Sequence, residues 1–174
     1  MKKISTYDLA LSALACAFAV LFQVIGAYSD ILLFTGYLLS AVALTLPLAR
    51  KSYKGYFLAY LGACFLSLIL ASARFWDVIP FIVFFGLHPL VNELQLRAKI
   101  NVWVACFVKA LWFDATMYLT WQFLLDTTTV NPLVSQYILP IILIAGTAFF
   151  VFYDYTMYRA RAIVNNLASR FLKK

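Results

Sequence analysis

Residues 9–25 read LALSALACAFAVLFQVI, a long and largely apolar run near the start of the chain. Ala10, Ala13 and Ala17 recur along it at helical spacing, so one flank of the helix is nearly flat. A different flank is bulky and carries Leu11, Leu14, Phe18, Phe22 and Ile25. Small side chains inside a bilayer allow another helix to approach closely. The run therefore predicts a membrane helix with a surface suited to docking, against this chain's own helices or a different protein.

The rest of the chain repeats this apolar character. Of its 174 residues, 65% are hydrophobic and 12% are charged, which leaves too little polar surface for a soluble domain. Runs of about 20 apolar residues, the length that crosses a bilayer, follow one another. We therefore expect residues 1–174 to form one domain, an all-α integral membrane protein with six transmembrane helices. The predicted spans are about 7–27, 31–48, 55–72, 78–96, 101–125 and 135–158.

Basic residues are distributed unevenly over the predicted loops. With six spans, twelve of the 14 basic residues fall on one side: Lys2, Lys3, Arg50, Lys51, Lys54, Arg97, Lys99, Arg159, Arg161, Arg170, Lys173 and Lys174. The opposite side holds Arg74, Asp30, Asp77 and Asp126. Because cytoplasmic loops carry the excess of lysine and arginine, this pattern predicts that both termini are cytoplasmic. It also accounts for the net charge of +7 without nucleic acid. We expect the basic tail from Arg159 to continue as an interfacial helix.

Lys109 is the one basic residue inside a predicted span. It lies about eight positions into span 101–125, or ~12 Å along a helix. An ionisable group at that depth needs a partner, and Glu93 and Asp154 are the candidates in the same half of the membrane. An intramembrane ion pair is the leading interpretation. A lysine that snorkels to the cytoplasmic interface and a lysine that contacts substrate are the alternatives.

A polar face runs along the outer part of the same span. Asp114, Tyr118, Trp121 and Gln122 are spaced i, i+4, i+7 and i+8, which places them on one side of a helix. Aromatic rings supply contact area and polar groups fix orientation, as in small-molecule sites. The alternative divides the set into interfacial aromatics and a packing carboxylate. The outward loops could close over such a site or be ordinary interfacial segments; they hold Trp76, Asp77, Asp126, Asn131, Gln136 and Tyr137.

His88 precedes Pro89 in span 78–96, and Asn92 lies on the same face as His88. Pro89 lacks a backbone donor and favours a kink, which frees a carbonyl for polar neighbours to satisfy. We count His88 and Asn92 among the candidate substrate-binding residues, although a hydrogen-bonded kink explains them more simply. A proton relay through His88 is a further alternative. A single histidine without other ligands predicts no metal site.

Motifs of catalysis and cofactor binding are missing from the sequence. It contains no HExxH motif, P-loop or nucleophile motif, and the three cysteines match no metal or redox spacing. We therefore expect no enzyme activity, no cofactor and no metal.

The opening Met1-Lys2-Lys3-Ile4-Ser5-Thr6, followed by the alanine-rich run, resembles the substrate-binding S components of energy-coupling factor (ECF) vitamin transporters. The resemblance covers the six-span layout and an Ala-x-x-x-Ala spacing that Ala13 and Ala17, and also Ala15 and Ala19, match. It implies a bacterial cytoplasmic membrane protein that captures a vitamin-like micronutrient from outside. It further implies that Ala10, Ala13 and Ala17 dock on a coupling transmembrane subunit, which two cytoplasmic ATPases power.

Two other classes of function remain open at this point. One is a small structural protein resembling the rod-shape-determining MreD type, which acts through contacts with other membrane proteins. The other is an autonomous small transporter or intramembrane enzyme, suggested by Lys109, Asp114 and His88.

Overall fold

The computed structural model describes residues 5–29, 31–122 and 132–171, and every regular element in these ranges is a helix. The elements are α1 (Thr6–Ala27), α2 (Leu33–Ala49), α3 (Tyr53–Leu70), η1 (Ser72–Val78), η2 (Phe81–Phe85), α4 (His88–Ala98), α5 (Val102–Thr120), α6 (Pro132–Ile141), η4 (Ile142–Gly146) and α7 (Thr147–Phe171). η1 is a 3₁₀ helix, whereas η2 and η4 are π-helical. The expectation of an all-α fold is confirmed over these ranges.

The length and hydropathy of the helices suit a membrane. Within the described ranges, α1, α3, α5 and the stretch Gln136–Arg170 are each long and apolar enough to cross a bilayer. A fifth candidate results if η1 and the helical stretch Phe81–Ala98, bent by 45°, form one broken span. α2 is apolar but has only 17 residues, fewer than the ~20 of a typical span. The helices therefore indicate a membrane-embedded protein with four or five candidate spans.

Span 78–96, predicted as one helix, is broken. η1, η2 and α4 follow one another with a bend, and the loop predicted at residues 73–77 is part of the 3₁₀ helix η1. Pro80 lies at the bend between Val78 and Phe81, and it cannot donate a backbone hydrogen bond to the preceding turn. The kink predicted at Pro89 is not where the segment bends. Pro89 itself lies in the first turn of α4, a position that tolerates proline.

Two tyrosine side chains of α3 satisfy backbone carbonyl groups in η2 and just after it. The Tyr56 hydroxyl donates to the Gly86 carbonyl, and the Tyr60 hydroxyl donates to the Ile82 carbonyl at 2.6 Å. Buried carbonyls left without donors would be costly in an apolar interior.

The last predicted spans also have different ends. α5 ends at Thr120, and residues 123–125 of predicted span 101–125 lie outside the described ranges, as do Asp126 and Asn131. Instead of beginning at 135, the final helical segment begins at Pro132. α7 continues past 158 to Phe171, so Arg159, Arg161 and Arg170 of the predicted basic tail belong to the same helix.

α1 and α2 pack closely through small residues. Ala15 and Ala19 are completely buried, and the Ser40 hydroxyl of α2 donates to the Ala19 carbonyl at 2.9 Å. Gly26 and Gly36 bring the two backbones together, since a Cβ on Gly36 would lie 2.9 Å from the Cα of Gly26. Ala10, Ala13 and Ala17 lie on another side of α1 and are exposed.

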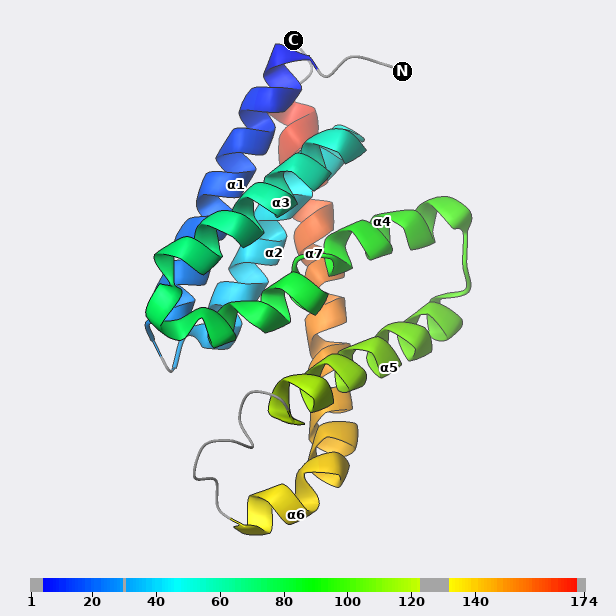
Figure 1. Ribbon diagram of the computed structural model, residues 1–174. Coiled ribbons are helices and arrows are strands. Elements are labelled where there is room, and N and C mark those ends of the chain that lie inside the picture. Colours follow the sequence, from blue (N-terminus) through cyan, green and yellow to red (C-terminus); the bar gives the residue numbers. More distant parts are fainter. Residues whose placement is uncertain (1–4, 30, 123–131, 172–174) are drawn as a thin grey trace.

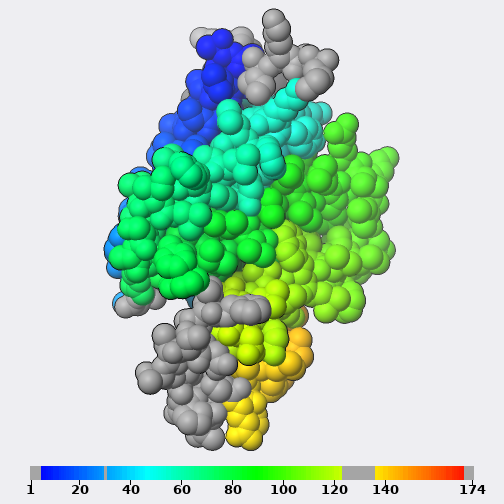
Figure 2. Space-filling model, viewed as in Figure 1, coloured from blue at the N-terminus to red at the C-terminus, as the bar shows by residue number. Residues whose placement is uncertain are grey.

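The two ends of the bundle differ in what they hold. The start of α1, the end of α7 and the α2–α3 connection lie at one end, while the α1–α2 connection, η1 and α6 lie toward the other (Figure 1). Figure 2 shows that side chains form a continuous surface over α4 and α5, whose ribbons are apart in Figure 1. Phe84 occupies the centre of the core, where its ring contacts Phe85, His88, Trp112, Phe113, Phe150 and Tyr153.

Candidate functional site

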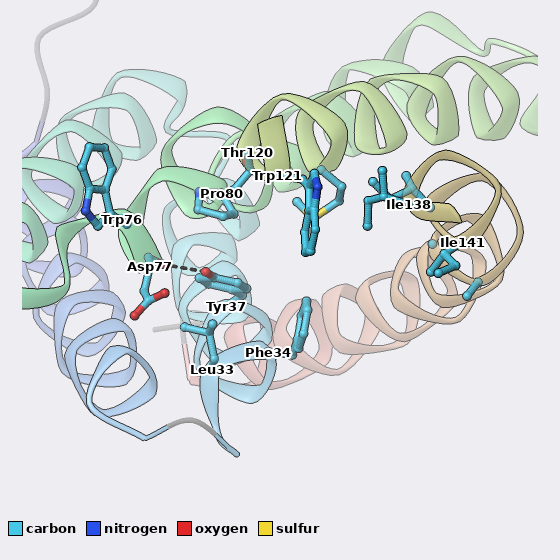
Figure 3. A pocket seen from close by; sticks show the side chains of 14 residues that line it. Leu33, Phe34, Tyr37, Trp76, Asp77, Pro80, Thr120, Trp121, Ile138 and Ile141 are labelled. Atoms are coloured by element: carbon cyan, nitrogen blue, oxygen red, sulfur yellow. Dashed lines mark hydrogen bonds between the residues drawn. The ribbon is translucent and has the colours of Figure 1, made fainter. Parts of the chain in front are cut away.

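A cavity of about 300 Å³ lies between α2, η1, the end of α5 and the α6–η4 segment. Most of its lining is apolar or aromatic, and the lining residues are Leu33, Phe34, Tyr37, Trp76, Asp77, Pro80, Met117, Thr120, Trp121, Ile138, Ile141, Ile142, Ala145 and Gly146. Figure 3 shows Trp121 and Phe34 reaching into it from different helices. This volume and lining are typical of a small-molecule site.

Hydrogen bonds hold η1, with Trp76 and Asp77, at the edge of the cavity. The Tyr37 hydroxyl of α2 donates to the Asp77 backbone carbonyl at 2.6 Å (Figure 3), and Gln23 Nε2 of α1 donates to the same oxygen at 3.3 Å. The Asp77 carboxylate lies 3.0 Å from Arg74 Nε. The short 3₁₀ helix is therefore tied to both α1 and α2.

Asp114 lies behind the cavity rather than in its lining. Its Oδ2 accepts a hydrogen bond of 2.8 Å from the Thr147 hydroxyl at the start of α7. Its Oδ1 is buried without a hydrogen-bond partner in the described part of the chain. Oδ1 faces Gly146, where a Cβ would approach it to 3.3 Å.

The predicted face of span 101–125 is thus only partly brought together. Trp121 lines the cavity and Asp114 lies next to Gly146, which also lines it. Tyr118 and Gln122 are exposed and do not line the cavity. Trp76, predicted from an outward loop, is part of the lining and half exposed.

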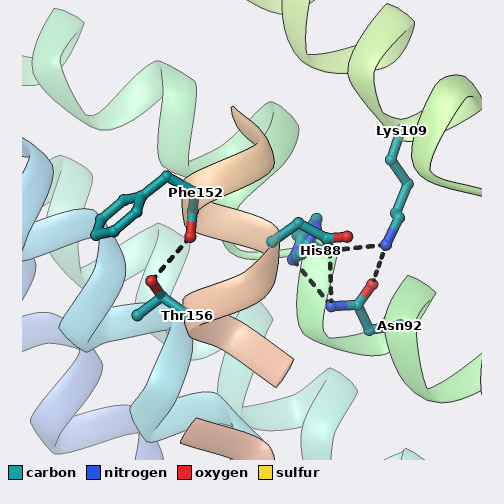
Figure 4. Close-up of polar contacts among 6 residues, drawn as sticks. His88, Asn92, Lys109, Phe152 and Thr156 are labelled. Atoms are coloured by element: carbon teal, nitrogen blue, oxygen red, sulfur yellow. Dashed lines mark hydrogen bonds and ion pairs between the residues drawn. The ribbon is translucent and has the colours of Figure 1, made fainter. Parts of the chain in front are cut away.

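A second polar group, the inner network, joins α4, α5 and α7. Lys109 Nζ lies 2.7 Å from Asp154 Oδ1 and donates to Asn92 Oδ1 at 2.7 Å (Figure 4). Asn92 Nδ2 donates to Asp154 Oδ1 at 3.3 Å, and His88 Nε2 lies 3.0 Å from the same oxygen. All four side chains are buried, and His88 is fully so. Removing one partner from such a set leaves a buried charge uncompensated.

Glu93 is not the partner of Lys109. Arg161 Nε donates to Glu93 Oε2 at 2.8 Å, so this carboxylate belongs to a separate ion pair. Two structural facts explain the difference. Asn92 and Glu93 are neighbours in α4 and point about 100° apart, and α7 continues as a helix to bring Arg161 alongside Glu93.

His88 and Asn92, predicted as substrate-binding residues, are part of the inner network, and neither lines the large cavity. A separate cavity of only about 10 Å³ is lined in part by Asn92 and Arg161. The network thus joins helices rather than forming a large binding site.

Phe34, Tyr37 and Gly146 are cavity residues that sequence reasoning missed. The only signal for Tyr37 was a phenol inside an apolar span, and Gly146 was the one glycine of span 135–158. Neither signal separates a ligand site from ordinary packing. Within the described ranges, no group of three or more His, Cys, Asp or Glu residues could hold a metal ion.

Comparisons with known proteins add no further assignment. No family model, no curated protein and no solved structure matches this chain. The features from which a function can be inferred are therefore the cavity, the Asp114 carboxylate and the inner network.

Proposed function

We propose that the chain is the substrate-capture subunit of an ECF-type importer in a bacterial cytoplasmic membrane. It binds a vitamin-like micronutrient from outside the cell and delivers it through a partner transmembrane subunit powered by two ATPases. In this proposal the chain spans the membrane six times with both termini in the cytoplasm. The short helix α2 then counts as one span, and the bent segment from η1 to α4 counts as another.

The cavity is the observation that carries the proposal. Its volume of about 300 Å³ suits a small molecule, and its walls offer aromatic rings from several helices. It lies at the end of the molecule that holds η1 and α6, away from the start of α1 and the end of α7 (Figure 1). If the basic loops are cytoplasmic, this end faces the outside, where a scavenged nutrient arrives.

A partner surface is the second requirement of an importer subunit that has no P-loop of its own. Ala15 and Ala19 are buried against α2, whereas the flank of α1 with Ala10, Ala13 and Ala17 is exposed. Small residues on an exposed membrane helix face permit close helix packing. In this proposal they contact the coupling subunit.

The test is uptake in cells together with mass spectrometry of the gently purified protein. We expect a small molecule to co-purify, and we expect Trp121→Ala to lose it. The double variant Ala13→Leu/Ala17→Leu should abolish uptake and keep ligand binding. A matched control, Ala115→Leu/Ala148→Leu, adds the same bulk at exposed positions on α5 and α7 and should transport normally. Normal uptake by the Ala13/Ala17 variant would reject docking through this flank.

The inner network favours a second candidate, an autonomous small transporter. Ionisable groups within membrane helices often mark transport pathways. Liposomes containing only this purified chain separate the two functions. Uptake without ATPase subunits supports the autonomous transporter, and complete dependence on them supports the capture subunit.

A further inference from the structure

Asp114 is a buried carboxylate whose charge has no cationic partner among the residues that the structure describes. The residue is 7% exposed, and within the described residues its side chain accepts one hydrogen bond, the 2.8 Å contact from the neutral Thr147 hydroxyl. The second oxygen, Oδ1, has no partner in this part of the chain. A carboxylate in an apolar interior is costly unless a proton or a cation compensates it.

Gly146 connects this carboxylate with the cavity. The residue lines the cavity, and a side chain at this position would place its Cβ 3.3 Å from Asp114 Oδ1. Because glycine has no side chain, residue 146 itself places no Cβ between the cavity and Oδ1, and the side chains of Ile142 and Phe113 lie 3.6 Å from that position. A ligand group that takes the place of this Cβ would lie about 3.3 Å from Oδ1.

Other charged groups near the cavity are already paired. Asp77 lies 3.0 Å from Arg74, and Lys109 is held by Asp154 and Asn92 in the inner network. The walls are otherwise mainly apolar and aromatic. Among the residues that the structure describes, the charge left for a ligand is therefore that of the Asp114 carboxylate, beside surfaces that favour a ring.

We propose that the cavity takes a ligand that joins a flat aromatic or apolar ring to a protonated amine or an equivalent cationic donor. The ring packs against Trp121 and Phe34, and the cation donates to Asp114 Oδ1 beside Gly146. This assignment of ligand class rests on the capture function proposed above. It excludes ligands whose only charged group is a carboxylate, because desolvating two like charges together is unfavourable.

Three matched probes test the assignment on the full-length purified protein in detergent: naphthylethylamine, naphthylethanol and naphthylpropionate. They share one ring system and differ in a cationic, neutral or anionic end group. Calorimetric titration should give the order amine, then alcohol, then carboxylate. We expect the amine to bind about tenfold or more tightly than the alcohol, a ratio that corresponds to about 1.4 kcal/mol.

Two variants test the role of Asp114, and one serves as a control. Asp114→Asn should reduce binding of the amine to that of the alcohol and leave the alcohol unchanged. Gly146→Ala should also weaken binding of the amine, because it places a methyl group between the cavity and the carboxylate. Asp8→Asn, at a carboxylate that pairs with Arg50 and does not line the cavity, should keep the preference for the amine.

The results also distinguish this inference from the proposed function. Equal binding of the amine and the alcohol by the unaltered protein, or a preference that survives Asp114→Asn, overturns the cationic ligand class. In that case, ATPase-dependent uptake of a co-purified molecule would still support the capture function. Binding of the carboxylate in preference to the amine, or of none of the probes, also overturns the ligand class. If an Asp114 variant does not fold, the probe series on the unaltered protein and Gly146→Ala still decide the question.

Discussion

One carboxylate is buried beside the cavity and another in the inner network, and the two differ in their partners. Asp154 has Lys109, Asn92 and His88 within 3.3 Å, contributed by two other helices. Asp114 has one neutral donor, and its second oxygen lies beside a cavity. A buried charge with a cationic partner fixes the arrangement of helices, whereas one without a cation is available for a ligand. In our proposal, the same residue type serves packing in one region and recognition in the other.

The largest effect should come from removing the cation of the inner network. Lys109→Met leaves the Asp154 carboxylate buried beside neutral groups, so we expect the free energy of unfolding to fall by about 3–5 kcal/mol. Denaturant titration in detergent micelles measures it. Lys54→Met, at an exposed lysine of α3, is the matched control and should change stability little. Equal losses in both variants would show that the inner network does not hold the helices together.

The aromatic wall of the cavity should affect binding rather than stability. Trp121→Ala removes a large contact surface, so we expect the affinity for naphthylethylamine to fall by about 2 kcal/mol, roughly thirtyfold. The melting temperature should change little, because Trp121 is only partly buried. Gln122→Ala, its exposed neighbour outside the lining, should bind normally. Full affinity in Trp121→Ala would remove this face of α5 from the site.

The broken segment between the two regions should respond less strongly. Tyr60→Phe removes the hydroxyl that donates to the Ile82 carbonyl at 2.6 Å, and we expect a loss of about 1 kcal/mol of stability. Tyr28→Phe, whose hydroxyl makes an exposed bond of 3.3 Å to the Leu70 carbonyl, is the control and should lose less. Thermal unfolding followed by circular dichroism compares them. A Tyr60→Phe variant as stable as the unaltered protein would mean that π-helix η2 does not need this donor.

The smallest effect should come from an ion pair outside both regions. Arg50 Nε lies 2.8 Å from Asp8 Oδ1, and both side chains are partly exposed. Arg50→Gln should cost no more than about 1 kcal/mol, and high salt should reduce that cost further. The effect of Lys109→Met should be nearly independent of salt, because buried pairs are screened much less. A similar salt dependence in both variants would contradict the contrast between a buried and a surface pair.

Sequence reasoning recognised most of the charged groups but not their arrangement. The depth of Lys109 in its span predicted a need for a partner, and Asp154 was one of two candidates. Helical spacing alone does not say how α4 and α7 are rotated, so Glu93 could not be separated from Asp154. Arg161 was assigned to a tail outside the spans, because the sequence changes from apolar to basic near Arg159. The helix continues through that change, and so Arg161 reaches Glu93.

The cavity was even less accessible to sequence reasoning. Trp76, Asp114 and Trp121 were recognised by residue type and spacing. Phe34 and Tyr37 belong to α2, whose apolar residues look alike whether they face lipid, core or a cavity. The position of Tyr37 beside η1 depends on a long-range contact, the hydrogen bond from its hydroxyl to the Asp77 carbonyl.

The sequence by itself determined that the chain is helical and suited to a membrane, since apolar runs of this length leave few alternatives. It also determined where the basic residues concentrate and that the first helix carries alanines at helical spacing. Only the tertiary structure decided that Ala15 and Ala19 pack inside the chain while Ala10, Ala13 and Ala17 are exposed. It also decided which carboxylate is paired and which one lies beside a cavity. The reason is physical: periodicity specifies a face of a helix, but the partner of that face depends on how separate helices rotate and pack.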